Sequence, residues 1–200
     1  MKLAYVANVR FPSERAHAVH IAHMCRAFTT NGCDVTLVVN TRATSVTDSP
    51  EEYYGVEMPF RIVKRFSPDI APWGRLFFLS AAVLFSFLVS VYIRREKFDV
   101  VYSRDEWVLF IFSYLLPRQK IVFESHEAKY SFAVRRLLKK KVPLVVISEG
   151  IRDEYLQHGV STEAISVAHD AIDESFFASL PTKSEVRKKL MLPENDFIAM

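Results

Sequence analysis

The sequence has little of what disulfide-rich, fibrous or low-complexity chains need. Its 200 residues contain two cysteines, five glycines and nine prolines. Two cysteines, Cys25 and Cys33, are too few for a disulfide framework, and reduced thiols are typical of a cytosolic protein. So few glycines and prolines exclude a collagen-like or low-complexity chain. Half of the residues are hydrophobic, so we expect a globular protein, and the two reduced thiols lead us to expect it in the cytoplasm.

A strong excess of one charge is missing as well. Lysine and arginine number 26 against 23 aspartates and glutamates, which gives a net charge of +3. This weakly basic balance gives no reason to expect nucleic acid as a partner. The first residues also lack the long apolar run of a secretion signal, because their short apolar stretch stops at Asn8 and Arg10.

Short apolar runs alternate along the chain with segments of helical spacing. The runs predict strands at residues 3–9, 34–40, 61–66, 99–104, 120–126, 143–148 and 164–169. The helical spacing predicts helices at residues 14–30, 73–96, 105–115, 128–141 and 149–159. We expect Ser13 to cap the first helix and residues 41–59 to form a loop. Strands that alternate with helices, without hairpin turns, favour an α/β fold with a doubly wound parallel sheet, which is Rossmann-like.

The end of the chain predicts a change of domain. Residues 1–169 complete the alternating pattern, and residues 170–183 have the composition of a linker. A helix is then predicted at residues 184–190 and the start of a strand at residues 197–200. We therefore expect residues 184–200 to begin a second domain that is truncated.

The loop after the first predicted strand contains no glycine. It therefore lacks the G-x-G-x-x-G pattern of dinucleotide-binding folds, and the chain has no G-x-x-x-x-G-K-[ST] motif. Arg10 and Arg15 lie in this loop instead, beside the start of the first helix. Free N–H groups and the helix dipole favour an anion at that place. The alternative is a pair of solvated arginines.

Three histidines, His17, His20 and His23, lie on the first predicted helix. Steps of three residues bring imidazoles toward one point, but no cysteine or carboxylate within the helix completes a metal site. We therefore expect no bound metal, and we expect His17 and His20 to line a pocket for a hydroxylated ligand.

Other polar residues follow the later strands, and His126 is the candidate for catalysis. A neutral imidazole can donate to or accept from a sugar hydroxyl, and a carboxylate such as Glu124 or Glu127 fixes its tautomer. The alternative role of His126 is a structural cap on the next helix. Because ligands bind beyond the carboxyl ends of parallel strands, we predict that Arg10, Arg104 and His126 surround one shared hollow. Asp105 and Ser148 follow strands in the same way, and Ser148 is also a candidate helix cap.

Two segments point to a membrane surface. Leu76 to Ile93 is a run of 18 residues without a charge, which is short for a span and would separate the strands of one sheet. Either this helix is mostly buried or it inserts partly into a membrane face. The amphipathic segment 129–141 carries five basic residues from Arg135 to Lys141, which attract anionic lipid, although a solvated basic face is the alternative.

Five segments in order resemble the N-terminal half of glycosyltransferase family 4. They are AYVANVRFPSERAHAVHIAHMCRAF (4–28), VVYSRD (100–105), FESHE (123–127), VVISEGIRDEY (145–155) and VAHDAID…F (167–176). The resemblance implies the GT-B architecture, in which two Rossmann-like domains face each other across a cleft. The N-terminal domain receives the acceptor, and the C-terminal domain binds the nucleotide-sugar.

The resemblance also implies an activity and roles for individual residues. Members transfer a sugar with retention of configuration and without a bound metal or other cofactor, here a hexose from a nucleotide-diphosphate sugar to a glycan or lipid-linked acceptor in polysaccharide biosynthesis. His126 matches the histidine near the transferred sugar, and the loop from Arg10 to His20 lies near the donor phosphates and the acceptor. Arg104, Asp105, Glu127 and Ser148 are the remaining expected binding residues. The 200 residues alone are expected to be inactive, and the alternative is a non-catalytic sugar- or lipid-binding module.

Overall fold

The computed structural model describes residues 1–70, 74–116, 120–172 and 180–198. The chain forms two compact units, residues 1–168 and residues 169–200. The first unit contains a seven-stranded parallel sheet in the order β3-β2-β1-β4-β5-β6-β7. The strands are β1 (Lys2–Ala7), β2 (Asp34–Asn40), β3 (Arg61–Arg65), β4 (Val100–Ser103), β5 (Lys120–Ser125), β6 (Leu144–Val146) and β7 (Ile165–Val167).

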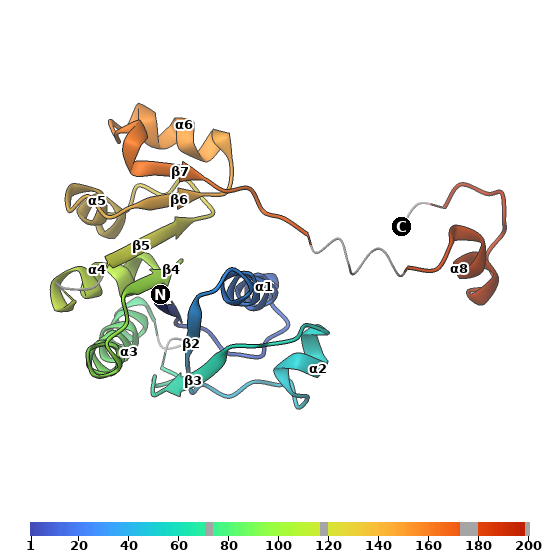
Figure 1. Ribbon diagram of the computed structural model, residues 1–200, viewed down its shortest axis with the longest axis horizontal. Coiled ribbons are helices and arrows are strands. Elements are labelled where there is room, and N and C mark those ends of the chain that lie inside the picture. The colour runs from blue at the N-terminus through green and yellow to red at the C-terminus, as the bar shows by residue number, and fades with distance from the viewer. Residues whose placement is uncertain (71–73, 117–119, 173–179, 199–200) are drawn as a thin grey trace. The chain divides into compact units, whose positions relative to one another are not determined.

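Helices cover both faces of this sheet. They are α1 (Ala16–Thr30), α2 (Pro50–Tyr54), α3 (Arg75–Glu96), α4 (Glu106–Leu115), α5 (Phe132–Lys139) and α6 (Glu149–Gln157), with a short 3₁₀ turn, η2 (Thr162–Ala164), before β7. Figure 1 shows α1 and α2 on one side of the sheet and α3, α4 and α5 on the other. The strand order reverses direction after β3, which is the doubly wound α/β fold predicted from the sequence.

Strand β1 lies inside the sheet, between β2 and β4, and shows why helices cover both faces of the sheet. Its residues Ala4 and Val6 pack into the core under α3 to α6, where Phe85 is fully buried. The alternate residues Leu3 and Tyr5 pack against α1 on the other face. Successive side chains of a strand point to opposite faces, so a strand that is apolar throughout requires a helix layer on each side.

The second unit contains one described helix, α8 (Lys183–Lys189), with a capping box between Thr182 and Glu185. Residues 197 and 198 are not in a strand, so the strand predicted at 197–200 is wrong for them, and residues 199–200 lie outside the described part. That residues 170–183 form a linker and 184–200 begin a second domain stays a prediction.

Two details of the N-terminal half differ from the sequence-based expectation. Ser13 does not cap α1, because its backbone is held by the Tyr54 hydroxyl, and the helix begins only after Arg15. The segment predicted as a loop contains α2. This helix begins at Pro50, where Ser49 and Glu52 form a capping box. The S-P-E-E sequence carries that signal, a capping serine with proline at the first helical position.

The amphipathic segment 128–141 is helical over a shorter range than expected. Helix α5 begins at Phe132, after Ser131 accepts a hydrogen bond from the backbone of Val134. In the part of the chain that the structure describes, no helix combines the length and apolarity needed to cross a membrane.

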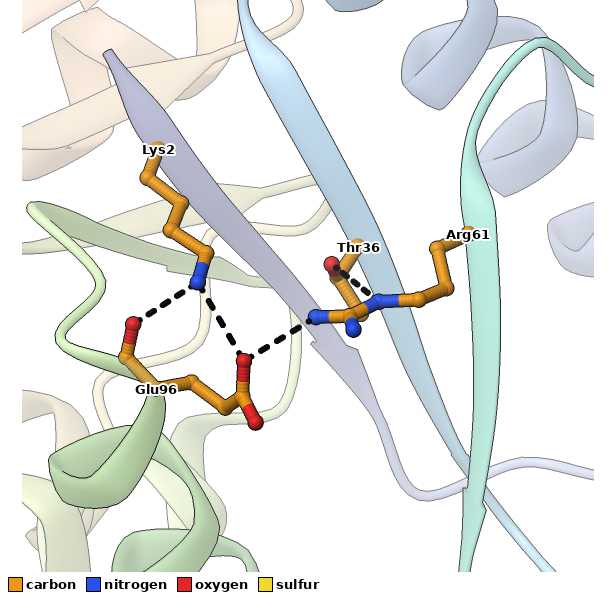
Figure 2. A network of polar contacts seen from close by, with 4 residues as sticks. All are labelled: Lys2, Thr36, Arg61 and Glu96. Carbon is orange, nitrogen blue, oxygen red and sulfur yellow. Dashed lines mark hydrogen bonds and ion pairs between the residues drawn. The ribbon is translucent and has the colours of Figure 1, made fainter.

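A polar network ties the amino ends of three strands to the end of α3 (Figure 2). The Lys2 ammonium donates to the backbone oxygen of Glu96 at 2.8 Å and lies 3.2 Å from its carboxylate. Arg61 lies 3.4 Å from the same carboxylate, and its Nε donates to the hydroxyl of buried Thr36 at 3.3 Å. This network stabilises the sheet at the edge opposite to the polar residues that follow the strands.

The hydrogen bonds from Lys2 and Arg61 hold the pKa of Glu96 below its ordinary value of 4.5. A carboxyl with a lowered pKa stabilises the fold above 4.5, and that stabilisation disappears as the pH falls through the folded pKa. We expect Glu96→Gln to lower the melting temperature at pH 7 and to match the wild type near pH 3. Exposed Glu57→Gln is the control; an equal loss for Glu96→Gln at both pH values would contradict this role.

Candidate functional site

All the strands run in the same direction, so the residues that follow them gather along one edge of the sheet. Arg10 follows β1, Arg104 follows β4, His126 follows β5 and Ser148 follows β6. The start of α1, with His17 and His20 in its first two turns, lies over the same edge, since each helix runs back against its strand. Ligands of doubly wound folds bind at this edge.

A buried carboxylate, Glu124, is the centre of the polar residues at the end of β5. Its side chain is 2% exposed, and its Oε2 accepts a hydrogen bond from the Tyr5 hydroxyl at 3.1 Å. Its Oε1 lies 2.5 Å from Nε2 of His126 and 3.6 Å from Nε2 of His20. The alternation of β5 explains the position, because Val122 and Glu124 point to the α1 face while Ile121 and Phe123 enter the opposite core.

The charge state of this cluster follows from its contacts. Burial raises the pKa of Glu124, but the hydrogen bond from His126 and the charges of His20, His126 and Arg104 outweigh burial and leave the pKa below its ordinary value. Burial and the nearby Glu124 raise the pKa values of Tyr5 and Tyr102, so both phenols stay protonated. The centre of the cluster is therefore an ionised carboxylate that accepts hydrogen bonds from phenol and imidazole donors.

The tautomers of the two histidines follow from these contacts as well. A carboxylate only accepts hydrogen bonds, so His126 carries a proton on Nε2, and in its neutral form Nδ1 is an acceptor. Arg104 only donates, and its Nη1 lies 3.4 Å from Nδ1 of His20, so His20 directs its Nε2 proton at Glu124. The rings of His20 and His126 meet edge to face, with centroids 4.8 Å apart.

The turn that carries His126 is held by its neighbours. The Ser125 hydroxyl donates to the backbone oxygen of Glu127 at 2.6 Å and lies 3.0 Å from the Tyr155 hydroxyl. Tyr155, on α6, donates in turn to the backbone oxygen of Lys129 at 3.1 Å. This turn orders His126 before any ligand arrives, as a catalytic or binding side chain requires.

A small hollow of about 100 Å³ opens at this point, and we call it the histidine pocket. It is lined by Arg104, Glu106, Phe123, Glu124, Ser125, His126, Glu127 and Lys129. Glu127 and Lys129 form an exposed ion pair at 2.8 Å on its rim. The pocket offers donors and acceptors of both charges, which suits a ligand rich in hydroxyl groups.

A larger hollow of about 370 Å³ lies beside the start of α1, and we call it the arginine pocket. It is lined by Asn8, Val9, Arg10, Ser13, Glu14, Arg15, His17, Arg42, Thr44, Ser45 and Asp69. Among the described residues no side chain caps α1, and Ala18 N–H donates to the backbone oxygen of Arg15 at 2.9 Å, so the two N–H groups before it are the ones that face a ligand. Three arginines at an uncapped helix start fit an anion such as a phosphate.

Two charged side chains of the arginine pocket are already engaged. Arg10 forms an ion pair with Asp69 at 2.9 Å, and both side chains are about half exposed.

Burial, followed by the charges of Arg104 and Arg15, lowers the pKa of His17, so His17 is neutral near pH 7 and acts as a polar rather than a cationic contact.

Arg42 belongs to this pocket although the sequence analysis did not single it out. Its Nη2 donates to the backbone oxygen of Asn8 at 2.7 Å. Its buried Nε has no hydrogen-bond partner among the described residues. The only sequence signal is position, since Arg42 follows the end of β2 by two residues, as the other site residues follow their strands.

The structure separates residues that were predicted to share one hollow. Arg104, His126 and Glu127 line the histidine pocket, whereas Arg10, Arg15 and His17 line the arginine pocket. The shared hollow predicted for Arg10, Arg104 and His126 is therefore wrong, because Asp69 holds Arg10 over a different loop. His20 packs against His126 and contacts Arg104. The charge of Arg104 also helps to lower the pKa of His17, which lines the other pocket.

The two remaining candidates cap helices and line neither pocket. Ser148 accepts a hydrogen bond from the backbone of Ile151, which confirms its expected cap on α6. Asp105 accepts hydrogen bonds from the backbones of Trp107 and Val108 at the start of α4, and burial raises its pKa. Contacts of Asp105 and Ser148 with a ligand stay predictions.

The cap gives a test of Asp105. We expect Asp105→Ala to lower the free energy of unfolding by about 1–2 kcal/mol in urea denaturation, because it removes the acceptor for two backbone N–H groups. Asp105→Asn keeps an acceptor and is the matched control. Equal losses for both variants would show that the negative charge, rather than the cap, is the property that matters.

Comparisons with known proteins identify the family and agree with the fold. The model of Glycosyltransferase Family 4 matches residues 17–176. A glycosyltransferase from Rickettsia africae ESF-5 is similar in structure, with a TM-score of 0.66 and 12% identity over 97% of this chain and 50% of the other. Sucrose-phosphate synthase from Thermosynechococcus elongatus is also similar, with a TM-score of 0.65 and 12% identity over 96% of this chain and 53% of the other.

A third similar structure carries ligands. Alr3699/HepE from Anabaena, in complex with UDP and glucose, gives a TM-score of 0.60 and 14% identity over 95% of this chain and 50% of the other. The chain thus spans about half the length of these solved structures. No curated protein matches it.

Proposed function

The chain belongs to glycosyltransferase family 4, and on that premise we propose that it is the acceptor-side domain of a retaining glycosyltransferase. Its fold is Rossmann-like and corresponds to one half of the GT-B architecture. In the proposed reaction a hexose moves from a nucleotide-diphosphate sugar to a hydroxyl of a glycan or lipid-linked acceptor. The nucleotide would be bound by a second domain.

The pairing of His126 with buried Glu124 is the observation that carries this proposal. Glu124 fixes the imidazole with Nε2 protonated, so Nδ1 can accept a hydrogen bond from a hexose hydroxyl. A partial positive charge develops on the sugar ring as its bond to the diphosphate breaks. The ionised Glu124 behind the imidazole supports that charge electrostatically, and such preorganised dipoles act strongly in a water-poor cleft.

The arginine pocket supports the second half of the proposal. Arg15 and Arg42, together with the uncapped start of α1, offer positive charge and N–H donors to a diphosphate. In the retaining step the acceptor oxygen bonds to the anomeric carbon on the face from which the diphosphate departs. The departing diphosphate oxygen takes the acceptor proton, so the protein needs no strong base of its own. Arg104 and Glu127 would bind acceptor hydroxyls.

The ligands of a similar structure suggest the donor. Alr3699/HepE binds UDP and glucose, and we propose a hexose carried on a nucleoside diphosphate of this kind. We also propose a cytoplasmic reaction at the inner face of the plasma membrane. Both cysteines are free thiols, as expected of a reducing compartment.

The experiment requires a protein in which these residues are followed by a nucleotide-sugar-binding domain. We expect it to consume a nucleotide-diphosphate hexose in the presence of an acceptor and to give a product with the anomeric configuration of the donor, measured by proton NMR. An inverted product would contradict the retaining mechanism. Binding of sugar without turnover would support the non-catalytic module instead.

A further inference from the structure

The outer face of α3 is an exposed apolar stripe. Leu76, Val83 and Phe87 are 78%, 53% and 54% exposed, and Leu84, beside Val83, is 39% exposed. These positions repeat at helical spacing and lie opposite the buried residues of the same helix, such as Phe85, Val89 and Ile93. A soluble domain rarely leaves so many large apolar side chains on one face without a partner.

Aromatic residues continue this surface across α4 to α5. On α4, Phe110 lies between Trp107 and Tyr114, with ring centroids 6.2 Å and 5.4 Å away. The ring of Phe132, the first residue of α5, lies 5.7 Å from Phe110. Tyrosine and tryptophan are enriched where one side of a protein meets a membrane interface.

Basic residues surround these rings. Residues 129–141 contain six lysines and arginines and no acidic residue. Lys140 Nζ lies 3.1 Å from the centroid of Tyr114, and the Arg136 guanidinium lies 5.1 Å from that of Phe132. A hollow of about 180 Å³ is lined by Phe132, Arg135, Arg136 and Lys139. One aromatic wall and three cations suit a phosphate group that is joined to an apolar chain.

The three helices form one continuous layer. Arg94 of α3 donates to the backbone oxygen of Leu115 in α4, and Lys140, after α5, donates to that of Ser113 at 2.8 Å. Figure 1 shows α3, α4 and α5 along the same side of the sheet. Each helix begins near the carboxyl ends of the strands, so the exposed half of α3 and the start of α5 lie toward the edge that carries the histidine pocket.

We propose that the outer surface of α3, α4 and α5 docks on an anionic lipid bilayer, with a lipid phosphate bound in the hollow between Phe132 and Lys139 of α5. The charges favour lipid over a second copy of this chain, because a symmetric dimer would place two sets of α5 cations against each other. The apolar stripe enters the headgroup region while the cations bind phosphate, as in other interfacial helices. This deepens the proposed function, since it brings a lipid-linked acceptor to the edge of the histidine pocket.

Co-sedimentation with vesicles tests the proposal and needs neither donor nor acceptor, so its failure is distinct from failure of the transferase proposal. We expect the full chain to bind vesicles that contain phosphatidylglycerol and not vesicles of phosphatidylcholine alone. The triple variant Arg135→Gln, Arg136→Gln, Lys139→Gln is expected to bind about 100-fold more weakly, which corresponds to about 1 kcal/mol for each basic residue. High salt should weaken binding as well.

A matched control removes the same charge elsewhere. The variant Lys183→Gln, Lys188→Gln, Lys189→Gln changes exposed residues of the second compact unit and is expected to bind within a few-fold of the wild type. A second variant, Leu76→Ser with Phe87→Ser, should bind vesicles more weakly than the wild type at high salt. Circular dichroism verifies that each variant is folded. Equal binding to neutral vesicles, full binding by the arginine variant, or a dimer that Phe87→Ser dissociates would overturn the proposal.

Discussion

Replacing His126 by alanine, in a protein that joins these residues to a nucleotide-sugar-binding domain, is expected to lower kcat by about 100- to 1,000-fold, the range for loss of a group that stabilises charge in a transition state. The reason is geometric, because Glu124 holds His126 through Nε2, and the proposed function assigns Nδ1 to the transferred sugar. The change also removes the closest donor of buried Glu124, so a loss of stability is expected beside the loss of turnover. Initial rates and thermal melting separate the two effects.

Two further variants make this prediction specific. His126→Gln keeps a donor for Glu124 but lacks the imidazole, and it should be nearly as slow as the alanine variant. His158→Ala removes an exposed histidine outside both pockets and should leave kcat close to that of the wild type. Wild-type turnover by His126→Ala would remove the role assigned to the imidazole.

Replacing Glu124 by alanine is expected to lower the free energy of unfolding by about 3–5 kcal/mol, the usual cost of removing one partner from a buried charged network. The change leaves the Tyr5 hydroxyl and Nε2 of His126 without their acceptor inside the protein. Glu124→Gln keeps the shape and one acceptor, so a smaller loss of about 1–3 kcal/mol is expected. Urea denaturation measures both values.

The pH dependence of Glu124→Gln adds a second signature. Because the pKa of Glu124 is lowered in the folded protein, its stabilisation is present above about 4.5 and is lost as the pH falls through the folded pKa. The glutamine variant should therefore approach the wild type at acid pH. Glu127→Ala is the control, since this carboxylate is exposed beside Lys129 and its loss should change stability little. A similar loss in both alanine variants would contradict the central position of Glu124.

The strand pattern of the sequence was sufficient to predict the fold, because buried parallel strands appear as continuous apolar runs. The runs around Leu3 to Val9 and Val100 to Arg104 gave both the strands and the edge where polar residues gather. The family resemblance drawn from the same segments is confirmed by the family match. The pattern did not predict where every helix begins: α1 begins after Arg15 rather than after Ser13, and α2 lies within the predicted loop.

The arrangement within the site depended on contacts between distant parts of the chain. Asp69 pairs with Arg10 across 59 positions and holds it away from His126, which no local pattern predicts. The sequence predicts Glu124 as a partner of His126, two residues away, but the second partner of Glu124, Tyr5, lies 119 positions away on β1. The order of the strands decides which charged side chains become neighbours at this edge. The sequence pattern predicts the edge at which they lie, but not their neighbours along it.

A crystal structure of these residues joined to a nucleotide-sugar-binding domain, with a nucleotide-diphosphate hexose bound, tests the central claim most directly. We expect a hexose hydroxyl within hydrogen-bond distance of His126 in the histidine pocket, and the diphosphate beside Arg15 and Arg42 at the start of α1. A hexose bound away from Glu124 and His126, with water in both pockets, would contradict this account.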